Sequence, residues 1–249
     1  MSVKKCAIMS VGNNTQHLAS PTFMLGHSCI PAVESMSDLG VTMNRSLTFT
    51  SHICNVVHKA SIRMNLLFKC FTSRNNSTLI RGYKVYVRPI LEYSSVIWSP
   101  HRVKDIKALE AVQRKFTKRL NGLQYLPYAD RLQATKLESL QERRTNSDLI
   151  FTYKILFGHV RVNCNDFFNL NPNAYDTRGH AHRLTVPQSR IDVRKYFFSC
   201  RVVQTWNSLP DNTDFSSLAR FKNFIHLINF NQHYDTPFCT FMFLDKLSK

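Results

Sequence analysis

The stretch "LEYSSVIWSPHRVKDIKALEAVQRKFTKRL" (Leu91 to Leu120) decides the fold that we expect, because an apolar, aromatic segment passes directly into a basic one. Its last eighteen residues hold six Lys or Arg and only two acids. At helical periodicity these residues divide into an apolar arc and an opposite basic arc. The apolar arc holds Ile106, Leu109, Val112, Phe116 and Leu120, and the basic arc holds Lys104, Lys107, Arg114, Lys115, Lys118 and Arg119. We predict a helix from Val103 to Leu120 that packs on the aromatic corner and turns its cations outward.

Helical periodicity also extends to both sides of this stretch. From Thr48 onward apolar residues recur at i, i+3 and i+4, while Lys59 and Arg63 lie on the other face. The run "NNS" at 75–77 supplies N-cap residues for a further helix, in which Pro89 should cause a kink or an end. The basic stripe of that helix holds Arg81, Lys84 and Arg88. Shorter helices are expected at 128–136, 140–157 and 192–210, and a last one from Leu218.

The first forty residues predict short strands instead of helices. The apolar runs "CAIMSV" (6–11) and "FMLGHSCIPAV" (23–33) flank the turn-prone "GNNTQ". Gly40 in "DLGVTM" indicates a bulge or a close approach of the backbone. The fold class that we expect is therefore α+β and mostly α-helical, with a small β segment at the N-terminal side. Trp98 and Trp206 both lie in apolar segments, and we expect both in the core.

The charge balance indicates a polyanionic partner. The chain has 33 Lys+Arg against 16 Asp+Glu, which gives a formal charge of +17 and a pI near 9.8. No acid occurs between Asp38 and Glu92, whereas that interval holds eight Lys or Arg. A second basic patch is expected in the polar loop at Arg178 and Arg183, extending to Arg190, Arg194 and Lys195.

Other classes of protein find little support in the residues. No apolar run reaches eighteen residues and no signal peptide is visible, so we expect no membrane partner. Seven scattered cysteines suit reduced thiols and a cytoplasmic or nuclear protein. His52, Cys54 and His58, like Cys164, His180 and His182, lack the spacing of a zinc site, and we interpret them as ordinary core and surface residues. "YAD" (128–130) continues with Arg131 where a polymerase turn would place a second Asp, so we predict no metal-dependent catalytic site.

Six segments together resemble the C-terminal part of non-LTR retrotransposon reverse transcriptases of the jockey or CR1 kind. They are "KKCAIMSVG", "SDLGVTMNRSLTFTSHI", "YKVYVRPILEYSSVIWSP", "ALEAVQRKFTKRLNGL", "YADRLQATKLESLQERR" and "DVRKYFFSCRVVQTWNSLP". The resemblance runs from about Lys4 to about Phe230. It implies a palm remnant with a β-hairpin at 1–44, a thumb-like helical bundle at 45–125, a post-thumb helical region at 126–230 and a poorly specified tail at 231–249.

The resemblance also implies roles for particular residues. Lys5 would correspond to the lysine near the incoming triphosphate, and Leu39 and Gly40 to the primer grip. The catalytic carboxylates, which hold Mg²⁺ in the intact enzyme, have no counterpart here, so we expect the chain to be inactive alone and to carry no cofactor. The expected partner is RNA, an RNA–DNA hybrid or a DNA duplex, bound through the basic helix faces. The alternatives are a regulatory module that docks on a complete reverse transcriptase and a translated relic without function.

Overall fold

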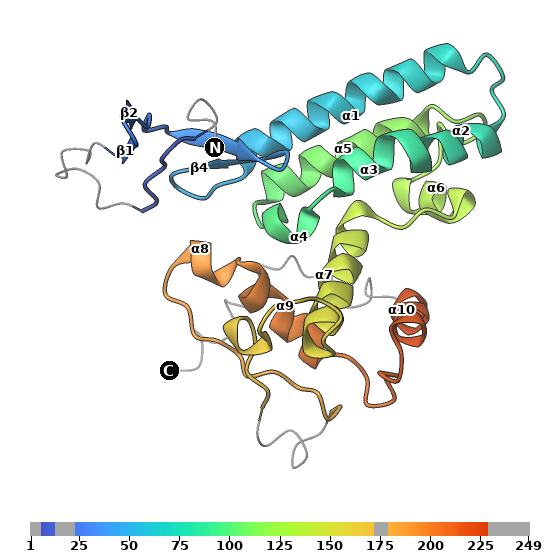
Figure 1. Ribbon diagram of the computed structural model, residues 1–249. Coiled ribbons are helices and arrows are strands. Elements are labelled where there is room, and N and C mark those ends of the chain that lie inside the picture. The colour runs from blue at the N-terminus through green and yellow to red at the C-terminus, as the bar shows by residue number, and fades with distance from the viewer. Residues whose placement is uncertain (1–5, 13–22, 172–178, 229–249) are drawn as a thin grey trace, which may run out of the picture. The chain divides into compact units, whose positions relative to one another are not determined.

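The structure is a computed structural model that describes residues 6–12, 23–171 and 179–228. The expectations for Lys5, Arg178 and the tail at 231–249 lie outside the described residues. The fold is mostly α-helical, with two small antiparallel hairpins near the N-terminal side, as the sequence predicts. The chain divides into two compact units, Met1–Leu137 and Glu138–Lys249, which are described separately below (Figure 1).

The N-terminal β segment consists of two hairpins. Strand β1 (Met24–Leu25) pairs with β2 (Ser28–Cys29), and β3 (Ser35–Asp38) pairs with β4 (Val41–Asn44). The run "CAIMSV", which we expected to be a strand, contributes one isolated bridge, between Ile8 and Ala32. This segment buries little apolar surface, so it has few contacts that could extend the pairing.

Gly40, for which the sequence indicates a bulge or a close approach of the backbone, lies in the turn between β3 and β4. Asp38 pairs with Val41, so Leu39 and Gly40 form a two-residue turn. Both have positive φ, 47° and 83°, as a type I′ turn requires. The Tyr93 hydroxyl donates a hydrogen bond to the Leu39 carbonyl at 3.0 Å, and Tyr93 is also the side chain nearest to Gly40. Gly40 therefore allows the backbone conformation of the turn, and the hydrogen bond from Tyr93 connects the hairpin tip to the helical part of the unit.

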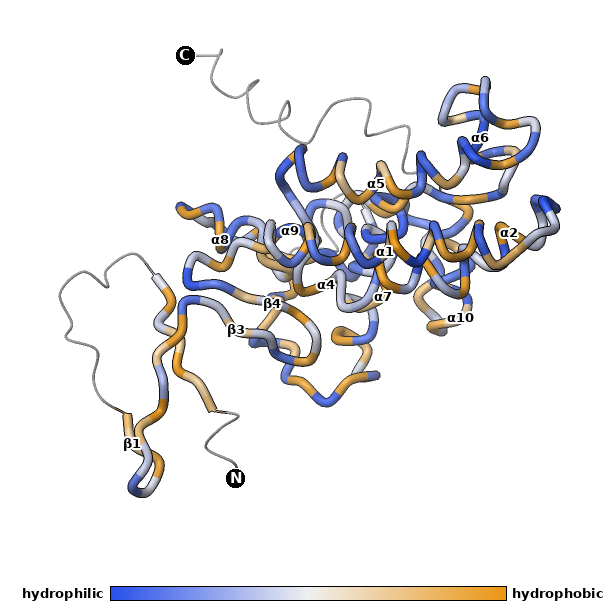
Figure 2. Tube along the Cα trace, turned by 90° about the horizontal axis from the view of Figure 1, so that it is seen from above, coloured by the Kyte–Doolittle hydropathy of each residue, from blue (hydrophilic) through white to orange (hydrophobic). Residues whose placement is uncertain are grey.

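The core of the first unit is the packing of α1 (Thr50–Cys70) against α5 (Val103–Lys118). Phe116 of α5 stacks on Tyr83 with ring centroids 4.3 Å apart and packs tilted against Phe68 of α1 at 5.7 Å. All three rings are buried. Hydrophilic and hydrophobic positions alternate along both helices, as expected for amphipathic helices packed along one side (Figure 2). The predicted apolar arc of α5 is buried from Leu109 to Leu120 and half-buried at Ile106.

The second helical segment is continuous through Pro89. It consists of α2 (Asn76–Gly82), a π-helical turn, η2 (Tyr83–Val87), and α3 (Arg88–Glu92). Asn75 caps α2 as predicted, because its side chain accepts from the Ser77 and Thr78 amides. The Arg88 amide donates to the Tyr83 carbonyl, one residue further back than in an α-helix. This wider turn makes room for the proline ring, so the helix does not end there.

Two short helices complete the first unit. Helix α4 (Ser95–Trp98) buries Trp98 completely, and its indole nitrogen donates to the Tyr93 carbonyl at 2.7 Å. Helix α6 (Tyr128–Thr135) packs against α5. It contains the "YAD" string, so Asp130 lies on an exposed helical turn and not on a turn between strands.

The second unit is built around α7 (Leu140–Leu156), which packs on α9 (Phe198–Asn207) and α10 (Leu218–Leu227). The short helices η3 (Cys164–Asp166) and α8 (Asp192–Lys195) lie in the connections. Arg201 donates two hydrogen bonds of 2.9 Å to Asp148, which joins α9 to α7. Trp206 is completely buried, as predicted, and its indole nitrogen donates to the His182 carbonyl.

Membrane spans and disulfides are both missing from the described part of the chain. No helix in the described ranges combines the length and the apolar character that a bilayer crossing needs. All six cysteines among the described residues are free thiols.

The burial of Trp98 leads to a stability prediction. Trp98→Ala should reduce the free energy of unfolding by about 3–5 kcal/mol, because it leaves a large cavity and an unpaired Tyr93 carbonyl. Tyr125 is 92% exposed, so Tyr125→Ala should leave stability unchanged and serves as the control. Chemical denaturation followed by circular dichroism measures both. A Trp98→Ala variant as stable as the parent would contradict the packing described here.

A second prediction concerns pH and His52. Burial, followed by the Lys59 charge, lowers the pKa of His52 below its ordinary value of 6.5. Its Nδ1 accepts a hydrogen bond from the Thr42 amide at 3.2 Å, which requires the unprotonated nitrogen. Below pH 6.5 the unfolded chain takes up a proton that the folded chain resists, so the free energy of unfolding should fall as the pH decreases from about 7 to about 5.

His58 supplies the control for this pH effect, because it is exposed on the same helix. His52→Gln should lose part of the pH dependence, whereas His58→Gln should keep the dependence of the parent. NMR titration of the parent measures the same property without a variant. A His52 that titrates at or above 6.5 would be inconsistent with its buried position.

Candidate nucleic-acid interface

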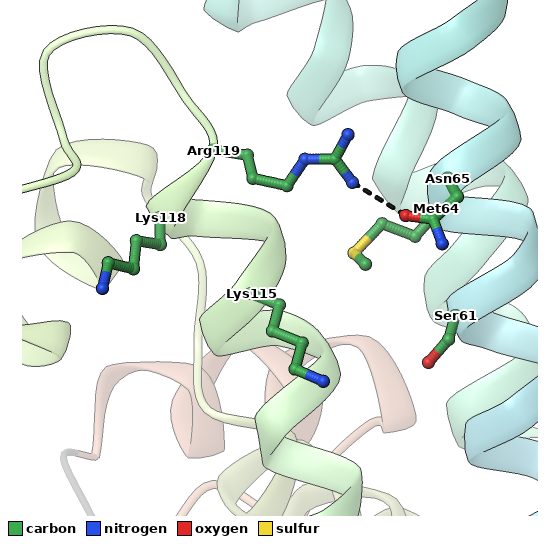
Figure 3. A pocket seen from close by; sticks show the side chains of 6 residues that line it. All are labelled: Ser61, Met64, Asn65, Lys115, Lys118 and Arg119. Atoms are coloured by element: carbon green, nitrogen blue, oxygen red, sulfur yellow. Dashed lines mark hydrogen bonds between the residues drawn. The ribbon is translucent and has the colours of Figure 1, made fainter.

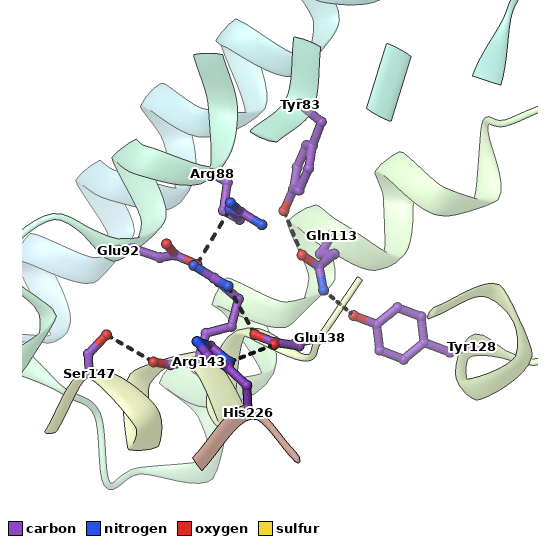
Figure 4. Close-up of polar contacts among 9 residues, drawn as sticks. All are labelled: Tyr83, Arg88, Glu92, Gln113, Tyr128, Glu138, Arg143, Ser147 and His226. Carbon is purple, nitrogen blue, oxygen red and sulfur yellow. Dashed lines mark hydrogen bonds and ion pairs between the residues drawn. The ribbon is translucent and has the colours of Figure 1, made fainter. Parts of the chain in front are cut away.

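The candidate interface is the outer side of α5. A buried polar network on the α6 side orients this helix. The Tyr83 hydroxyl donates to Gln113 Oε1 at 3.0 Å, and Gln113 Nε2 donates to the Tyr128 hydroxyl at 3.1 Å (Figure 4). Tyr128 in turn donates to the Glu110 carboxylate. Burial, reinforced by Glu110, raises the pKa of Tyr128 well above its ordinary value of 10.0, so the phenol stays a donor.

The polar residues of α5 in this network, Glu110 and Gln113, face inward, whereas the cations of the helix are exposed. Arg114 lies over the Tyr128 ring with its guanidinium carbon 4.7 Å from the ring centroid, and Arg131 donates to the Arg114 carbonyl at 3.0 Å. The two acids of α5 are both buried, and Asp105 accepts a hydrogen bond from Thr50 at 2.9 Å. The outer side of α5 therefore presents positive charge without a neighbouring carboxylate on the same helix.

All six cations predicted on the basic arc of α5 are exposed: Lys104, Lys107, Arg114, Lys115, Lys118 and Arg119. In the described part of the chain, none of the six has a carboxylate within ion-pair distance. Six uncompensated charges over sixteen residues produce a strong local potential, which suits a ligand that carries a row of negative charges.

The other predicted cations of the first unit differ from one another in solvent exposure and in ion pairing. Lys59, Arg63 and Arg81 are exposed, but Lys84 and Arg88 are half-buried, and Arg88 forms an ion pair with Glu92 at 3.8 Å. By helical periodicity, Lys59 and Arg63 lie on the opposite edge of α1 from Asn65, which contacts Arg119 of α5. The structure thus brings the α5 cations together and places the α1 cations on a different edge.

The remaining predicted site residues belong to other segments of the chain than α5. Leu39 is 83% exposed at the tip of the β3–β4 turn, beside Gly40. Arg183 lies in the second unit, where it is half-buried against Gly179. Lys5 and Arg178 lie outside the described residues, so the structure shows nothing of their positions.

Three residues near α5 have roles that the sequence analysis did not assign. Asn65 accepts a hydrogen bond of 2.8 Å from Arg119 Nη1, and Ser61 lies one turn away on α1. Arg74 extends over the Phe68 ring, which Arg119 also covers. Arg74 belongs to the acid-free interval and could have been included on that ground, but Asn65 and Ser61 are polar positions that no periodicity distinguishes.

The described residues do not form a recognisable site for a divalent metal ion. No group of three or more His, Cys, Asp or Glu side chains comes together there in an arrangement that could hold a metal ion. His52 accepts a hydrogen bond from the Thr42 amide, and His180 Nε2 lies 2.9 Å from the Trp206 carbonyl. Both histidines therefore already have polar contacts within the core. We assign none of the described residues to Mg²⁺.

The fold and this surface define a helical module with a packed interior and a basic exterior helix face. An uncharacterized protein of Caenorhabditis elegans is 29% identical to it over 126 residues, which cover 49% of this chain and 64% of that protein. The RNA-directed DNA polymerase from the mobile element jockey of Drosophila melanogaster is 24% identical over 125 residues, which cover 49% of this chain and 13% of the polymerase. No protein-family model and no solved structure matches the chain.

These similarities support a distant relationship to the jockey polymerase and an origin in a retrotransposon. The matched stretches span about half of this chain and less than two thirds of either relative.

The polar network predicts a specific loss of stability. Tyr128→Phe removes the donor to the buried Glu110 carboxylate and the acceptor of Gln113, so the free energy of unfolding should decrease by about 1–3 kcal/mol. Tyr125→Phe makes the same chemical change at an exposed position and should have no effect. Urea denaturation compares the two variants. Equal stability of the Tyr128→Phe variant and the parent would show that the network does not anchor α6.

Proposed function

We propose that this chain binds the phosphate backbone of RNA, an RNA–DNA hybrid or a DNA duplex without sequence preference, as the thumb-like segment of a retrotransposon-derived reverse transcriptase. The observation that carries the proposal is the row of six exposed cations on α5, with no carboxylate within ion-pair distance in the described part of the chain. The similarity to the jockey polymerase supports the kind of ligand.

The physical basis is electrostatic. A nucleic-acid backbone carries closely spaced negative charges, and each Lys or Arg that neutralises a phosphate releases condensed counterions. Contacts of this kind fix position on the backbone but do not read the bases. A rigid helix is well suited to them, because the burial of Leu109, Val112 and Phe116 holds the basic arc in one orientation. Catalysis is no part of the proposal.

The test removes three charges from α5 without disturbing its apolar side. Lys104→Gln, Lys107→Gln and Lys118→Gln keep good helix propensity, and all three positions are exposed. The triple variant should bind an RNA–DNA hybrid more weakly, to the same degree for two unrelated sequences. The slope of log affinity against log salt should become shallower by roughly 0.9 for each phosphate that is no longer neutralised, up to roughly 3 in total.

A charge-matched triple variant in the second unit provides the control. This variant removes three exposed cations of the second unit by the changes Arg161→Gln, Arg190→Gln and Arg194→Gln; Arg190 and Arg194 belong to the other candidate surface. This variant should keep the affinity and the salt slope of the parent. If its affinity falls instead, and the α5 variant binds like the parent, the interface lies in the second unit and the proposal for α5 is wrong.

Binding and thermal unfolding together decide between the proposal and the alternatives. A regulatory module that docks on a complete reverse transcriptase would show little affinity for bare duplex, and its affinity would depend weakly on salt. A relic without function would unfold without a cooperative transition.

A further inference from the structure

A groove between α1 and α5 lies at the end of the basic arc. It encloses about 360 Å³ and is lined by Ser61, Met64, Asn65, Lys115, Lys118 and Arg119. Lys115 and Arg119 reach from α5 toward α1, whereas Lys118 points away (Figure 3). The groove thus has two cations on one wall and the hydroxyl and amide of α1 on the other.

Arg119 is held in place by two contacts. Its Nη1 donates to Asn65 Oδ1 at 2.8 Å, and its guanidinium carbon lies 3.9 Å from the centroid of the Phe68 ring. Phe68 is buried, so the ring is a fixed support. The Asn65 bond uses one of the five N–H donors of the guanidinium, and the others remain for a ligand. A side chain fixed in this way loses little conformational entropy when it binds.

A second arginine is brought to the same ring by the loop that follows α1. The guanidinium carbon of Arg74 lies 5.9 Å from the Phe68 centroid. Its carbonyl accepts a hydrogen bond from Asn121 Nδ2 at 3.1 Å. Asn76 and Asn121 exchange two further bonds, of 2.9 Å and 3.1 Å, between side chain and backbone. The loop and the end of α5 are therefore clamped together, with one arginine on each.

The helix dipole alone does not account for this arrangement. Cations in the last turn of a helix offset its negative end, and Lys115 and Lys118 are well placed to do so. That effect requires neither the bond from Arg119 to Asn65 nor a second guanidinium from another segment. No acidic side chain lines the groove, and α1 contains no acid at all. The charge of the two arginines is thus left for an external anion.

We propose that this groove is a phosphate-binding site in which Arg119 donates from its planar fork to a phosphate oxygen pair, with Lys115 and Arg74 completing the positive field. The ligand is a backbone phosphate of the bound nucleic-acid strand; this identity rests on the proposed function, whereas the site itself rests on the groove. Most other cations of α5 are exposed lysines without a comparable support, so the groove is the fixed point of the interface.

The first experiment compares substitutions that keep charge. Arg119→Lys retains the positive charge but loses the fork, so affinity for an RNA–DNA hybrid should fall about tenfold, as expected when a charge-assisted hydrogen bond is removed. Arg161→Lys makes the same change at an exposed position of the second unit and should bind like the parent. Circular dichroism confirms that both variants fold. Equal affinity of the two variants would overturn the groove site and leave the proposed function intact.

The second experiment needs no nucleic acid. Inorganic pyrophosphate is titrated into the isotopically labelled parent chain, and the Nε–H signals of Arg119 and Arg63 are followed by NMR. The Arg119 signal should shift with saturation, and the Arg63 signal should change less and without saturation. Equal, non-saturating shifts at both arginines would overturn the site. Saturation at Arg119 in a chain that fails to bind duplex would uphold the groove and refute the proposed function.

Discussion

The rest of the first unit depends on the position of Phe116 between Phe68 and Tyr83. This contact of three buried rings joins α5 to α1 and to the π-helical turn that precedes Pro89. Because Phe116 lies on one arc of α5, its burial determines which residues of that helix face outward. Tyr83 extends the same contact into a polar network through Gln113 to Tyr128, which brings α6 onto the other side of α5. The interior therefore fixes the direction of the basic arc, and the proposed interface follows from it.

The long helices could be predicted from the sequence because their signals are local. Apolar spacing predicted the helices at Thr50–Cys70, Val103–Lys118 and Leu140–Leu156, and an Asn side chain marked the start of α2. The sequence is less informative where a tertiary contact or a special backbone decides the local structure. Gly40 serves a type I′ turn with Leu39, and Tyr93, more than fifty residues away, holds that turn. Pro89 is accommodated by a π-helical turn that no local pattern announces.

The candidate site, like the fold, could be predicted in part from the sequence. Periodicity alone gives the exposure of the six α5 cations, because it separates the packed arc from the solvent arc. The ion pair of Arg88 with Glu92 joins positions four residues apart, so helical periodicity could have indicated it, whereas periodicity could not show that Arg183 is half-buried. It also could not find the groove, since the bond from Arg119 to Asn65 joins positions 54 residues apart and depends on how α1 and α5 pack. Charge is visible in a sequence, but its arrangement in space requires the fold.

The most direct measurement of the central claim is a footprint of lysine reactivity. The chain is acetylated briefly with and without a saturating RNA–DNA hybrid, and the modified lysines are quantified by mass spectrometry. The hybrid should protect Lys104, Lys107, Lys115 and Lys118, whereas Lys154 and Lys222 of the second unit should react as before. Unchanged reactivity along α5, or protection confined to the second unit, would contradict the claim that the outer side of α5 holds the nucleic acid.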